Sequence, residues 1–452
     1  MRQARIGDLK IHLREEPDST GVLVVNSNAV LFLDKIALDY FNAFFAVWEQ
    51  SAKSRRRETV ATLDPVLAGE KLTPAVVRAI TRRYRVPSER AAQDWGRLWN
   101  TVLAVATGSR CPFSDFEVRR VEPLSRELSA PYRVDLILTY RCQNNCAHCY
   151  AGGPRVTPEL PTADWKDIIQ KLADWGVPTL TFTGGEPLLR EDLEDLVAYA
   201  GKCGCVTGLI TNGRLLTRDR VQALFRAGLD FTQITLESSD PEIHDGMTGV
   251  EGSWAETVEG IKNSVPVIYT TTNTTVTQKN KETIPDTIRF LKSLRVSKFG
   301  INALIRSGRG VREEGLDPLE LRSLLEEVIR LSAALDLPFI WYTPTCYREL
   351  NPVALGLGVK TCSAASTVLA VEPDGNVMPC QSYYKSIGNA LKDDFPRIWR
   401  HPLAIALRRR RKGSQTPHPD FPGLPEKCLT CSELAMCGGS CPLERANPGP
   451  CR

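Results

Sequence analysis

The sequence lacks long apolar runs, an apolar segment near its start and a strong excess of either charge. Nothing in it approaches the roughly 20 consecutive apolar residues that span a bilayer, and the opening letters MRQARIGDLK have no apolar signal core. These absences predict a protein made and kept in the cytoplasm, without a membrane partner. The net charge of +4 comes from residues 1–108, where we favour a solvated helical face over a docking site for an acidic partner.

Cysteine is, by contrast, abundant, and the chain has 14 of them. Because cytoplasmic thiols stay reduced, this number argues against a disulfide framework and for metal ligands. After Pro338 the chain is rich in turns, has little apolar core of its own and is expected to fold around metal. Eight cysteines lie there: Cys346, Cys362, Cys380, Cys428, Cys431, Cys437, Cys441 and Cys451. We take Cys111, Cys203 and Cys205 as ordinary packing thiols.

The pattern of apolar residues divides the chain into three predicted domains and one linker. Residues 1–108 show a strand–turn–strand pattern in GVLVVNSNAVLFL and then three helical segments, which predicts a winged-helix-like module. Residues 109–131 contain three prolines and are expected to be a linker. Residues 132–337 alternate strands and helices, and residues 338–452 are loop-rich. A basic run from Arg408 to Lys412 suits the end of a helix, so nucleic acid is not an expected partner.

Six strand-like runs in residues 132–337 are each followed by a helical pattern: they are VDLILT, TLTFT, VTGLIT, FTQITL, VIYTTTNTTV and KFGINALI. This alternation indicates an α/β fold with a parallel sheet, which right-handed crossovers curl into a barrel or partial barrel of six strand–helix units. The chemistry of such folds gathers at the C-terminal ends of the strands. Cys142, Gly184 and Asn212 each follow a predicted strand end.

Three cysteines, Cys142, Cys146 and Cys149, fall within the segment YRCQNNCAHCY. A zinc site would need a fourth ligand, such as His148, and the CxxxCxxC spacing differs from the CxxC pairs of zinc ribbons. Three thiolates on a short loop suit a [4Fe–4S] cluster in which one iron has no protein ligand. That iron would be a place to bind and activate a small molecule.

With CxxxCxxC after the first strand and TGGEP after the second, residues 130–310 resemble the radical SAM enzymes. The resemblance implies that Gly184 and Gly185 let the backbone approach the methionyl amino group of S-adenosylmethionine (SAM). It also implies that Glu186, which marks the motif, is a cofactor-binding residue. It also implies that His148 packs near the adenine.

Two further motifs carry the same resemblance. Thr211 and Asn212 match the third-strand motif of the family. Thr235 and Glu237 are conservative replacements in its fourth-strand motif, usually Ser-Leu-Asp, and the resemblance implies that they lie near the ribose and the methionine moiety. The family often has an arginine in the tail of that motif, where this chain has Thr248. We therefore expect the contact to the SAM carboxylate to come from elsewhere.

A second resemblance covers the C-terminal cysteines, whose spacing follows the seven-cysteine SPASM pattern. It implies two auxiliary [4Fe–4S] clusters, and so three clusters in all. Cys362, Cys380 and Cys441 would hold the first, with Cys346 as its natural fourth ligand. The second would be held by Cys428, Cys431, Cys437 and Cys451. The alternative is a pair of zinc sites in a ribbon-like fold.

Residues 1–108 resemble, more weakly, the peptide-binding domain of the pyrroloquinoline-quinone chaperone type, also called the RiPP recognition element. Such domains hold a leader peptide as an added strand, with main-chain hydrogen bonds supplying affinity. The competing interpretation of this segment is a DNA-binding winged helix.

Together these resemblances imply an enzyme that reductively cleaves SAM to a 5′-deoxyadenosyl radical, with an electron from a flavodoxin- or ferredoxin-type donor. Its expected substrate is a ribosomally made precursor peptide, which it would oxidise and cross-link. One alternative is a non-peptide cofactor precursor or a partner enzyme. Sulfatase-maturing relatives place an acidic base after the cysteine equivalent to Cys380, where this chain has Gln381. Another alternative is a cluster-containing, DNA-binding regulator. No residue is singled out as the catalytic base.

Overall fold

The computed structural model describes residues 1–7, 9–26, 29–54, 64–106, 128–152, 157–410, 413, 418–421 and 423–446. The chain forms two compact units, one of residues 1–129 with 172–178 and one of residues 130–171 with 179–452. Within the described ranges, no helix is both long and apolar enough to cross a membrane. Most of the predicted linker, together with Cys111 and Cys451, lies outside the described residues.

The first unit is a four-stranded antiparallel sheet followed by three helices. Its strands, paired in chain order, are β1 (Arg2–Ile6), β2 (Leu9–Glu15), β3 (Gly21–Val25) and β4 (Ala29–Leu33). Its helices are α1 (Lys35–Ser54), α2 (Pro65–Tyr84) and α3 (Ser88–Ala106). The expected hairpin is present as β3 and β4. Sequence reasoning missed β1 and β2, because charged residues interrupt their apolar pattern.

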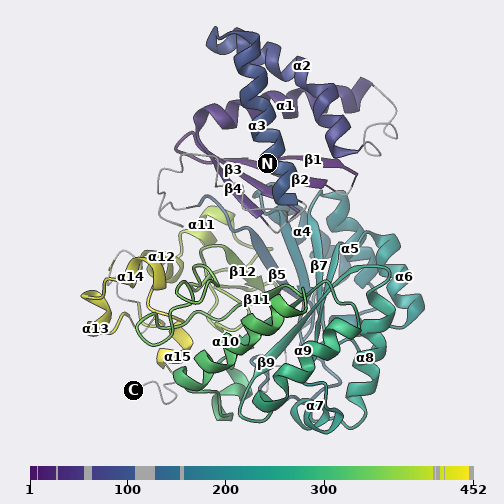
Figure 1. Cartoon of the computed structure of the whole chain (residues 1–452), viewed down its shortest axis with the longest axis vertical. Coiled ribbons are helices and arrows are strands. Elements are labelled where there is room, and N and C mark those ends of the chain that lie inside the picture. The colour runs from purple at the N-terminus through teal and green to yellow at the C-terminus, as the bar shows by residue number, and fades with distance from the viewer. Residues whose placement is uncertain are drawn as a thin grey trace. The chain divides into compact units, whose positions relative to one another are not determined.

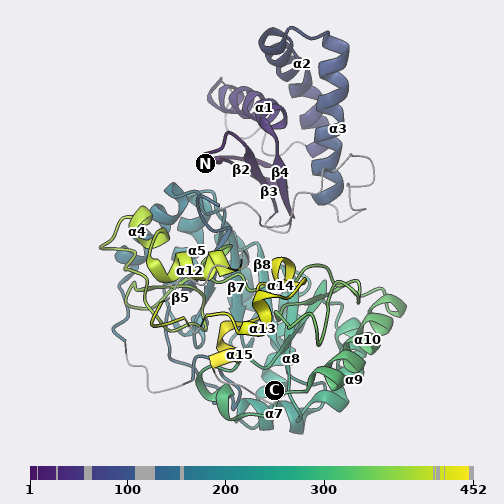
Figure 2. The same cartoon turned by 90° about the vertical axis from the view of Figure 1, so that its left-hand side faces the viewer.

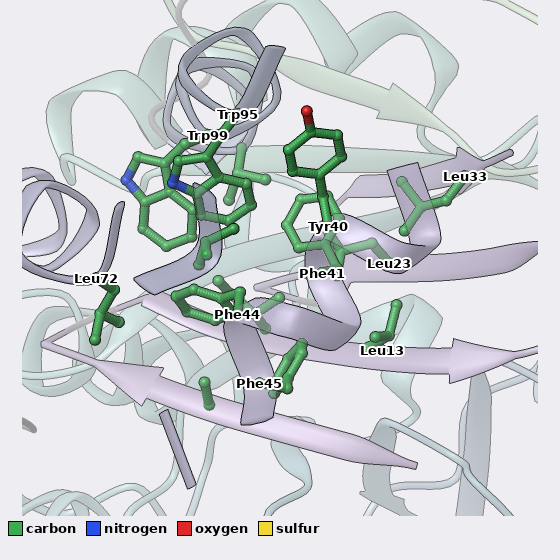
Figure 3. Packing of buried hydrophobic residues seen from close by; sticks show 14 of the residues in the cluster. Leu13, Leu23, Leu33, Tyr40, Phe41, Phe44, Phe45, Leu72, Trp95 and Trp99 are labelled. Carbon is green, nitrogen blue, oxygen red and sulfur yellow. The ribbon is translucent and has the colours of Figure 1, made fainter. Parts of the chain in front are cut away.

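An aromatic core holds this unit together (Figure 3). Phe44 of α1 lies 5.1 Å from Trp99 of α3 between ring centroids, and Phe41 lies 5.6 Å from Trp95. All four rings are buried. Trp95 and Trp99 are four residues apart, so they share one face of their helix. Large rings bury much apolar area, and these four fix the helices to each other and to the sheet.

The second unit is built on a nine-stranded sheet in the order β11-β10-β9-β8-β7-β6-β5-β12-β13. The strands are β5 (Arg133–Ile137), β6 (Thr179–Thr183), β7 (Val206–Thr211), β8 (Phe231–Thr235), β9 (Tyr269–Val276), β10 (Lys298–Ala303), β11 (Phe339–Trp341), β12 (Val368–Val371) and β13 (Val377–Met378). All neighbouring strands run parallel except β12 and β13. The predicted α/β class and its six parallel strands, β5 to β10, are confirmed.

The sheet continues beyond the six predicted strands into the C-terminal part of the chain. β12 pairs with β5, Val368 lying opposite Arg133, and β11 pairs with β10. Residues after 338 thus contribute strands to the same sheet, although the sequence pattern shows them only as loops. The division at residue 338 stays a prediction.

Helices follow most strands of this sheet (Figure 1). They are α4 (Thr162–Asp174), α5 (Leu193–Lys202), α6 (Arg218–Ala227), α7 (Pro241–Thr248), α8 (Ser253–Ser264), α9 (Ile284–Ser293) and α10 (Pro318–Ala334). Shorter helices follow in the C-terminal part (Figure 2): α11 (Phe395–Trp399), α12 (Pro402–Arg409), α13 (Glu426–Leu429), α14 (Leu434–Cys437) and α15 (Pro442–Ala446).

The two faces of the sheet differ in chemistry because successive strand residues point to opposite sides. One face is apolar and fully buried, as at Leu136 and Phe182, and helices α5 and α8 pack on β7 to β9. The other face carries Asp135, Gln233 and Asn273, which line a cavity. In closed barrels this interior is usually filled by branched apolar side chains. Here the polar face leaves room for a ligand.

Candidate functional site

The cavity on the polar face has a volume of about 610 Å³ and is the centre of the candidate site. The loop after β5 brings Cys142, Cys146 and Cys149 to its wall, as the sequence pattern predicts for adjacent thiols. The cavity lies at the C-terminal ends of the parallel strands, since loop residues after β6 and β7 also line it. Burial raises the pKa of Cys142 and of Cys146. Burial therefore favours the neutral thiols, and binding of a metal group would stabilise the thiolates instead.

Two arginines hold the backbone of the cysteine loop. Arg309, which follows β10, donates from Nε to the Cys146 carbonyl at 2.8 Å and from Nη1 to Asn145 Oδ1 at 2.7 Å. Arg214, which follows β7, donates to Asn144 Oδ1 at 2.7 Å. Hydrogen bonds to charged donors are stronger than those between neutral groups. The loop is thus fixed from two distant strands, a feature that sequence reasoning missed, although Arg214 directly follows the TNG motif.

The glycine pair after β6 is required by close backbone packing. A Cβ added to Gly184 would lie 2.3 Å from the Thr139 carbonyl oxygen, and one added to Gly185 would lie 2.3 Å from that of Arg141. Gly184 also has φ of +150°, in the region that favours glycine. Both glycines line the cavity. The close approach of the β6 loop to the cysteine loop therefore explains why both positions are glycine. The expected approach of their backbone to SAM stays a prediction.

Glu186 lies behind the cavity wall, not among the lining residues. Its buried carboxylate accepts hydrogen bonds from Asn212 N at 2.9 Å, Thr211 Oγ1 at 2.8 Å and Leu188 N at 3.0 Å. Burial raises the pKa of Glu186 to about 7. The sequence analysis expected Glu186 among the cofactor-binding residues. The carboxylate connects the β6 loop to the β7 loop and so positions Thr211 and Asn212, which line the cavity. The expected cofactor-binding role of Glu186 stays a prediction.

A buried pair joins the cysteine loop to the fourth predicted strand. His148 Nε2 lies 2.9 Å from Glu237 Oε1, and Glu237 Oε2 accepts from Thr275 N at 2.8 Å. Burial disfavours the protonated imidazole, but the Glu237 carboxylate outweighs it and raises the pKa of His148. His148, Thr235 and Glu237 all line the cavity. Because Gly184, Gly185, Thr211 and Asn212 line it too, the structure brings predicted residues of all four motifs together around one space.

Thr248 cannot replace the arginine that the family often has at its position. Its side chain is buried, and its hydroxyl lies 2.6 Å from Ser253 Oγ and donates to the Asp245 carbonyl at 3.1 Å. The cavity wall does include Arg309. Arg309 is thus a cation at the cavity that sequence reasoning missed, and it lies in the segment after β10.

The C-terminal cysteines separate into two groups. Cys362, Cys380 and Cys441 line the same cavity as the cysteine loop. A second cavity, of about 520 Å³, is lined by four thiols: Cys346, Cys428, Cys431 and Cys437. The sequence analysis expected Cys346 beside the first group, and the structure places it in the second. The reason is that the segment after β11 approaches α14, where Cys437 Sγ donates to the Thr345 carbonyl at 3.3 Å.

The zinc alternative can be compared with the spacing of these donors. Within the described ranges, no three His, Cys, Asp or Glu side chains are gathered closely enough to hold a single metal ion. The thiols instead surround cavities. All-cysteine donor sets are those of iron–sulfur clusters as well as of zinc, so the residues present fit an iron–sulfur cluster.

Two family models match the chain. The Radical SAM superfamily model matches residues 136–291, and SPASM, an iron–sulfur cluster-binding domain, matches residues 362–432. An AdoMet-dependent heme synthase of Methanosarcina barkeri (strain Fusaro / DSM 804) is 28% identical over 338 residues, covering 69% of this chain and 91% of the relative. AdoMet is another name for SAM.

Solved structures give the same fold. SuiB of Streptococcus suis, bound to the precursor peptide SuiA, has a TM-score of 0.68 and 18% identity, covering 98% of this chain and 96% of SuiB. The protein anSMEcpe with bound AdoMet has a TM-score of 0.53 and 16% identity, covering 69% of this chain and 89% of that one. Fold and site define a radical SAM enzyme. More particularly, the chain carries a SPASM domain after its radical SAM domain, and these domains imply iron–sulfur clusters and SAM as cofactors.

Proposed function

We propose that this enzyme cleaves SAM reductively at the cavity of the second unit and oxidises, by cross-linking, a ribosomally made precursor peptide. Cys142, Cys146 and Cys149 would hold the cluster at which SAM binds. Two auxiliary clusters would be held by the C-terminal thiols, giving three in all. The donor sets support this assignment of clusters. Three thiols on one loop line one cavity, and further thiols form two groups.

When bound, the cluster and SAM, with one electron from a flavodoxin- or ferredoxin-type donor, would supply a 5′-deoxyadenosyl radical that removes a hydrogen atom from an unactivated substrate carbon. Cross-linking would then release one proton and one electron, and an auxiliary cluster would accept the electron. The task of the chain is to hold the substrate carbon in place and to exclude water. Arg309 and Arg214 fix the cysteine loop, and Glu237 orients His148. We assign the contact to the SAM carboxylate to Arg309, the cation at the cavity near the cysteine loop.

The peptide substrate is supported by the first unit of the chain. Its antiparallel sheet has edges to which an extended peptide could add by main-chain hydrogen bonds. SuiB, which is solved with its precursor peptide, matches this chain over 98% of its length and so has counterparts to this unit. This length-wide likeness is the observation that carries the proposal, because anSMEcpe and the heme synthase each cover only 69% of this chain.

A non-peptide substrate is the second candidate. It is favoured by the heme synthase relative, because the match covers 91% of that relative. Gln381, which lines the cavity, stands where sulfatase-maturing relatives have an acidic base, so we do not favour a sulfatase partner. A regulator without radical chemistry is set aside, since the chain is a radical SAM enzyme.

The first test is formation of 5′-deoxyadenosine by anaerobic, cluster-reconstituted protein with dithionite and SAM. Wild type should form it and Cys142→Ala should fall to the assay background. The auxiliary thiols remain in that variant, so its iron content separates loss of one cluster from loss of all. Absence of product from cluster-replete wild type, together with no change of its spectrum on adding SAM, would end the proposal.

The substrate is tested separately by hydrogen exchange with a candidate precursor encoded beside the gene. Added peptide should slow exchange in peptides from residues 1–106, equally in wild type and in Cys142→Ala. Product then requires both peptide and SAM. If the precursor slows no exchange there and a porphyrin precursor is consumed instead, the enzyme acts on a small molecule.

A further inference from the structure

The basic run at the end of α12 contains one cation that lies inside the molecule. Leu403, Leu407 and Arg410 are spaced four and three residues apart, and the backbone of Arg410 is still helical, so the three share one face of the helix. Both leucines are buried and Arg410 is only 1% exposed, whereas the adjacent Arg409 is exposed. Arg410 thus occupies a position where the pattern of α12 predicts an apolar residue.

The guanidinium group of Arg410 has few partners for a buried charge. Its Nη2 donates to the Cys362 carbonyl at 3.3 Å, while Nε and Nη1 are buried and have no hydrogen-bond partner. Among the residues that the structure describes, Arg410 forms no ion pair. Burying a cation costs free energy unless an anion or further acceptors lie against it. The arrangement therefore indicates that a negatively charged group belongs beside Arg410.

Arg408, on the same helix, shows how a cation here is otherwise accommodated. It donates to the Ala365 carbonyl at 3.0 Å and to the Trp399 carbonyl at 2.6 Å, and its guanidinium carbon lies 4.4 Å from the centroid of the Trp399 ring. Two acceptors and an aromatic face stabilise this charge. The unpartnered nitrogens of Arg410 are thus a property of that residue and not of the helix end.

The end of α12 is attached to one of the two groups of C-terminal thiols. Arg410 holds the carbonyl of Cys362, and Ala365 N, from the same turn, donates to the Pro379 carbonyl at 2.8 Å, directly before Cys380. With Cys441, these cysteines line the first cavity. Arg410 itself lines neither cavity and is therefore out of reach of a substrate. Its charge acts on the cavity from behind the thiols.

We infer that Arg410 is the counter-charge of the cluster held by Cys362, Cys380 and Cys441 and makes that cluster easier to reduce. The inference rests on the proposed function, which includes this cluster. A [4Fe–4S] cluster with its thiolates is negatively charged, and its charge grows when it accepts an electron. A nearby cation stabilises the reduced form and so raises the reduction potential. This suits a cluster that would accept the electron released by cross-linking.

A redox titration of cluster-loaded protein measures the effect. Cys142→Ala removes the cluster of the cysteine loop, so that the electron paramagnetic resonance signals of the reduced protein come from the auxiliary clusters. In this background Arg410→Met, which removes the charge from a long side chain, should lower one auxiliary reduction potential by about 59 mV, a tenfold change for one electron. Arg410→Lys keeps the charge and should shift the same potential much less.

Arg409→Met is the matched control, because it removes the same charge one residue away, on the exposed side of the helix. Both auxiliary potentials should stay as they are in Cys142→Ala alone. A shift in this control as large as that in Arg410→Met would mean that the net charge of the protein, and not the buried guanidinium, sets the potential, and the inference would be wrong.

The remaining outcomes separate charge from structure. Unchanged potentials in Arg410→Met would overturn the inference, and so would equal shifts in Arg410→Met and Arg410→Lys, since a displaced Cys362 would then be the cause. If Arg410→Met fails to load one cluster and loses about four iron atoms, Arg410→Lys should load it, and loss in both would overturn the electrostatic role. Wild type with only about four iron atoms would remove the auxiliary clusters and the cofactor proposal with them, whereas full iron with unchanged potentials removes this inference alone.

Discussion

The interiors of the two units differ in composition. The core of the first unit is filled by stacked and tilted aromatic rings, including Phe44, Trp95 and Trp99. The second unit has a polar sheet face, with Asp135 and Asn273 on the wall of a cavity. Apolar packing stabilises a fold without leaving space, whereas a polar face costs stability and leaves space for a ligand. The difference indicates which interior serves folding and which serves chemistry.

The largest expected effect is a loss of stability in the aromatic interior that leaves the polar interior unchanged. Trp95→Ala removes a buried ring from the aromatic core and should lower the stability of the first unit by about 3–5 kcal/mol. Hydrogen exchange should rise in peptides from α1 and α3 and stay unchanged in those from β5 to β8. SAM cleavage without peptide should be unaffected. A matching loss of SAM cleavage would show that the two interiors are not independent.

The next effect concerns the polar interior. Gly185→Ala would place a Cβ against the Arg141 carbonyl and displace the cysteine loop. A shift of this kind can lower the rate about 100-fold, measured as 5′-deoxyadenosine formation. Gly201→Ala is the matched control, because a Cβ there meets nothing within 4 Å. Equal rates in the two variants would show that the tight approach of these loops is not needed for SAM cleavage.

The third effect is a pH dependence produced by burial of a carboxyl group. The pKa of Glu186 is raised by burial to about 7, from an ordinary value of 4.5. The folded chain therefore holds this proton more tightly than the unfolded chain, and the resulting stability is full below pH 4.5 and lost as pH rises through 7. Relative to Glu186→Gln, wild-type apoprotein should lose about 3 kcal/mol of unfolding free energy as the pH rises from below 4.5 to above 7.

Urea unfolding at several pH values measures this difference. Three donated hydrogen bonds favour the charged form of Glu186 and limit the size of the effect. A difference between wild type and variant that grows with pH, in favour of the wild type, would mean that these donors outweigh burial.

The smallest effect distinguishes ligand contact from loop support. Arg309→Lys should weaken binding of SAM about tenfold, the size of one lost charged hydrogen bond, and weaken binding of decarboxylated SAM no more than Arg214→Lys does. Arg214→Lys is the control, since Arg214 also holds the cysteine loop but does not line the cavity. Binding is followed by the change that SAM causes in the cluster spectrum. If Arg309→Lys weakens both ligands equally, Arg309 serves the loop alone.

Much of the second unit could be predicted because its strands are long and each is followed by an amphipathic helix. The position of the cysteine loop, the glycine pair and Asn212 at strand ends followed from the same alternation. Strands β11 to β13 have two to four residues, too few to show a period, and were not predictable. These strands form because neighbouring strands of the sheet pair with them, which their own sequence does not indicate.

The parts of the site that were missed depend on contacts between distant segments. Nothing near Arg309 in the sequence shows that it reaches the cysteine loop, and spacing alone cannot show that Cys346 lies near Cys437. The motif assigns Glu186 to the cofactor site, which stays a prediction, but it does not indicate that the carboxylate accepts hydrogen bonds from Leu188 N, Thr211 Oγ1 and Asn212 N. A motif marks a position, while the hydrogen bonds of that position decide what it contacts.

The pairing of β12 with β5 has a consequence for synthesis of the chain. Because the ribosome makes the chain from its N-terminus, β5 emerges long before Val368–Val371, its partner on that side. Until then β5 has an open edge, the kind of surface that pairs with other chains and leads to aggregation. Chaperone binding or rapid cluster insertion during this interval would protect the nascent enzyme, and its yield in cells should depend on how fast the C-terminal third is translated.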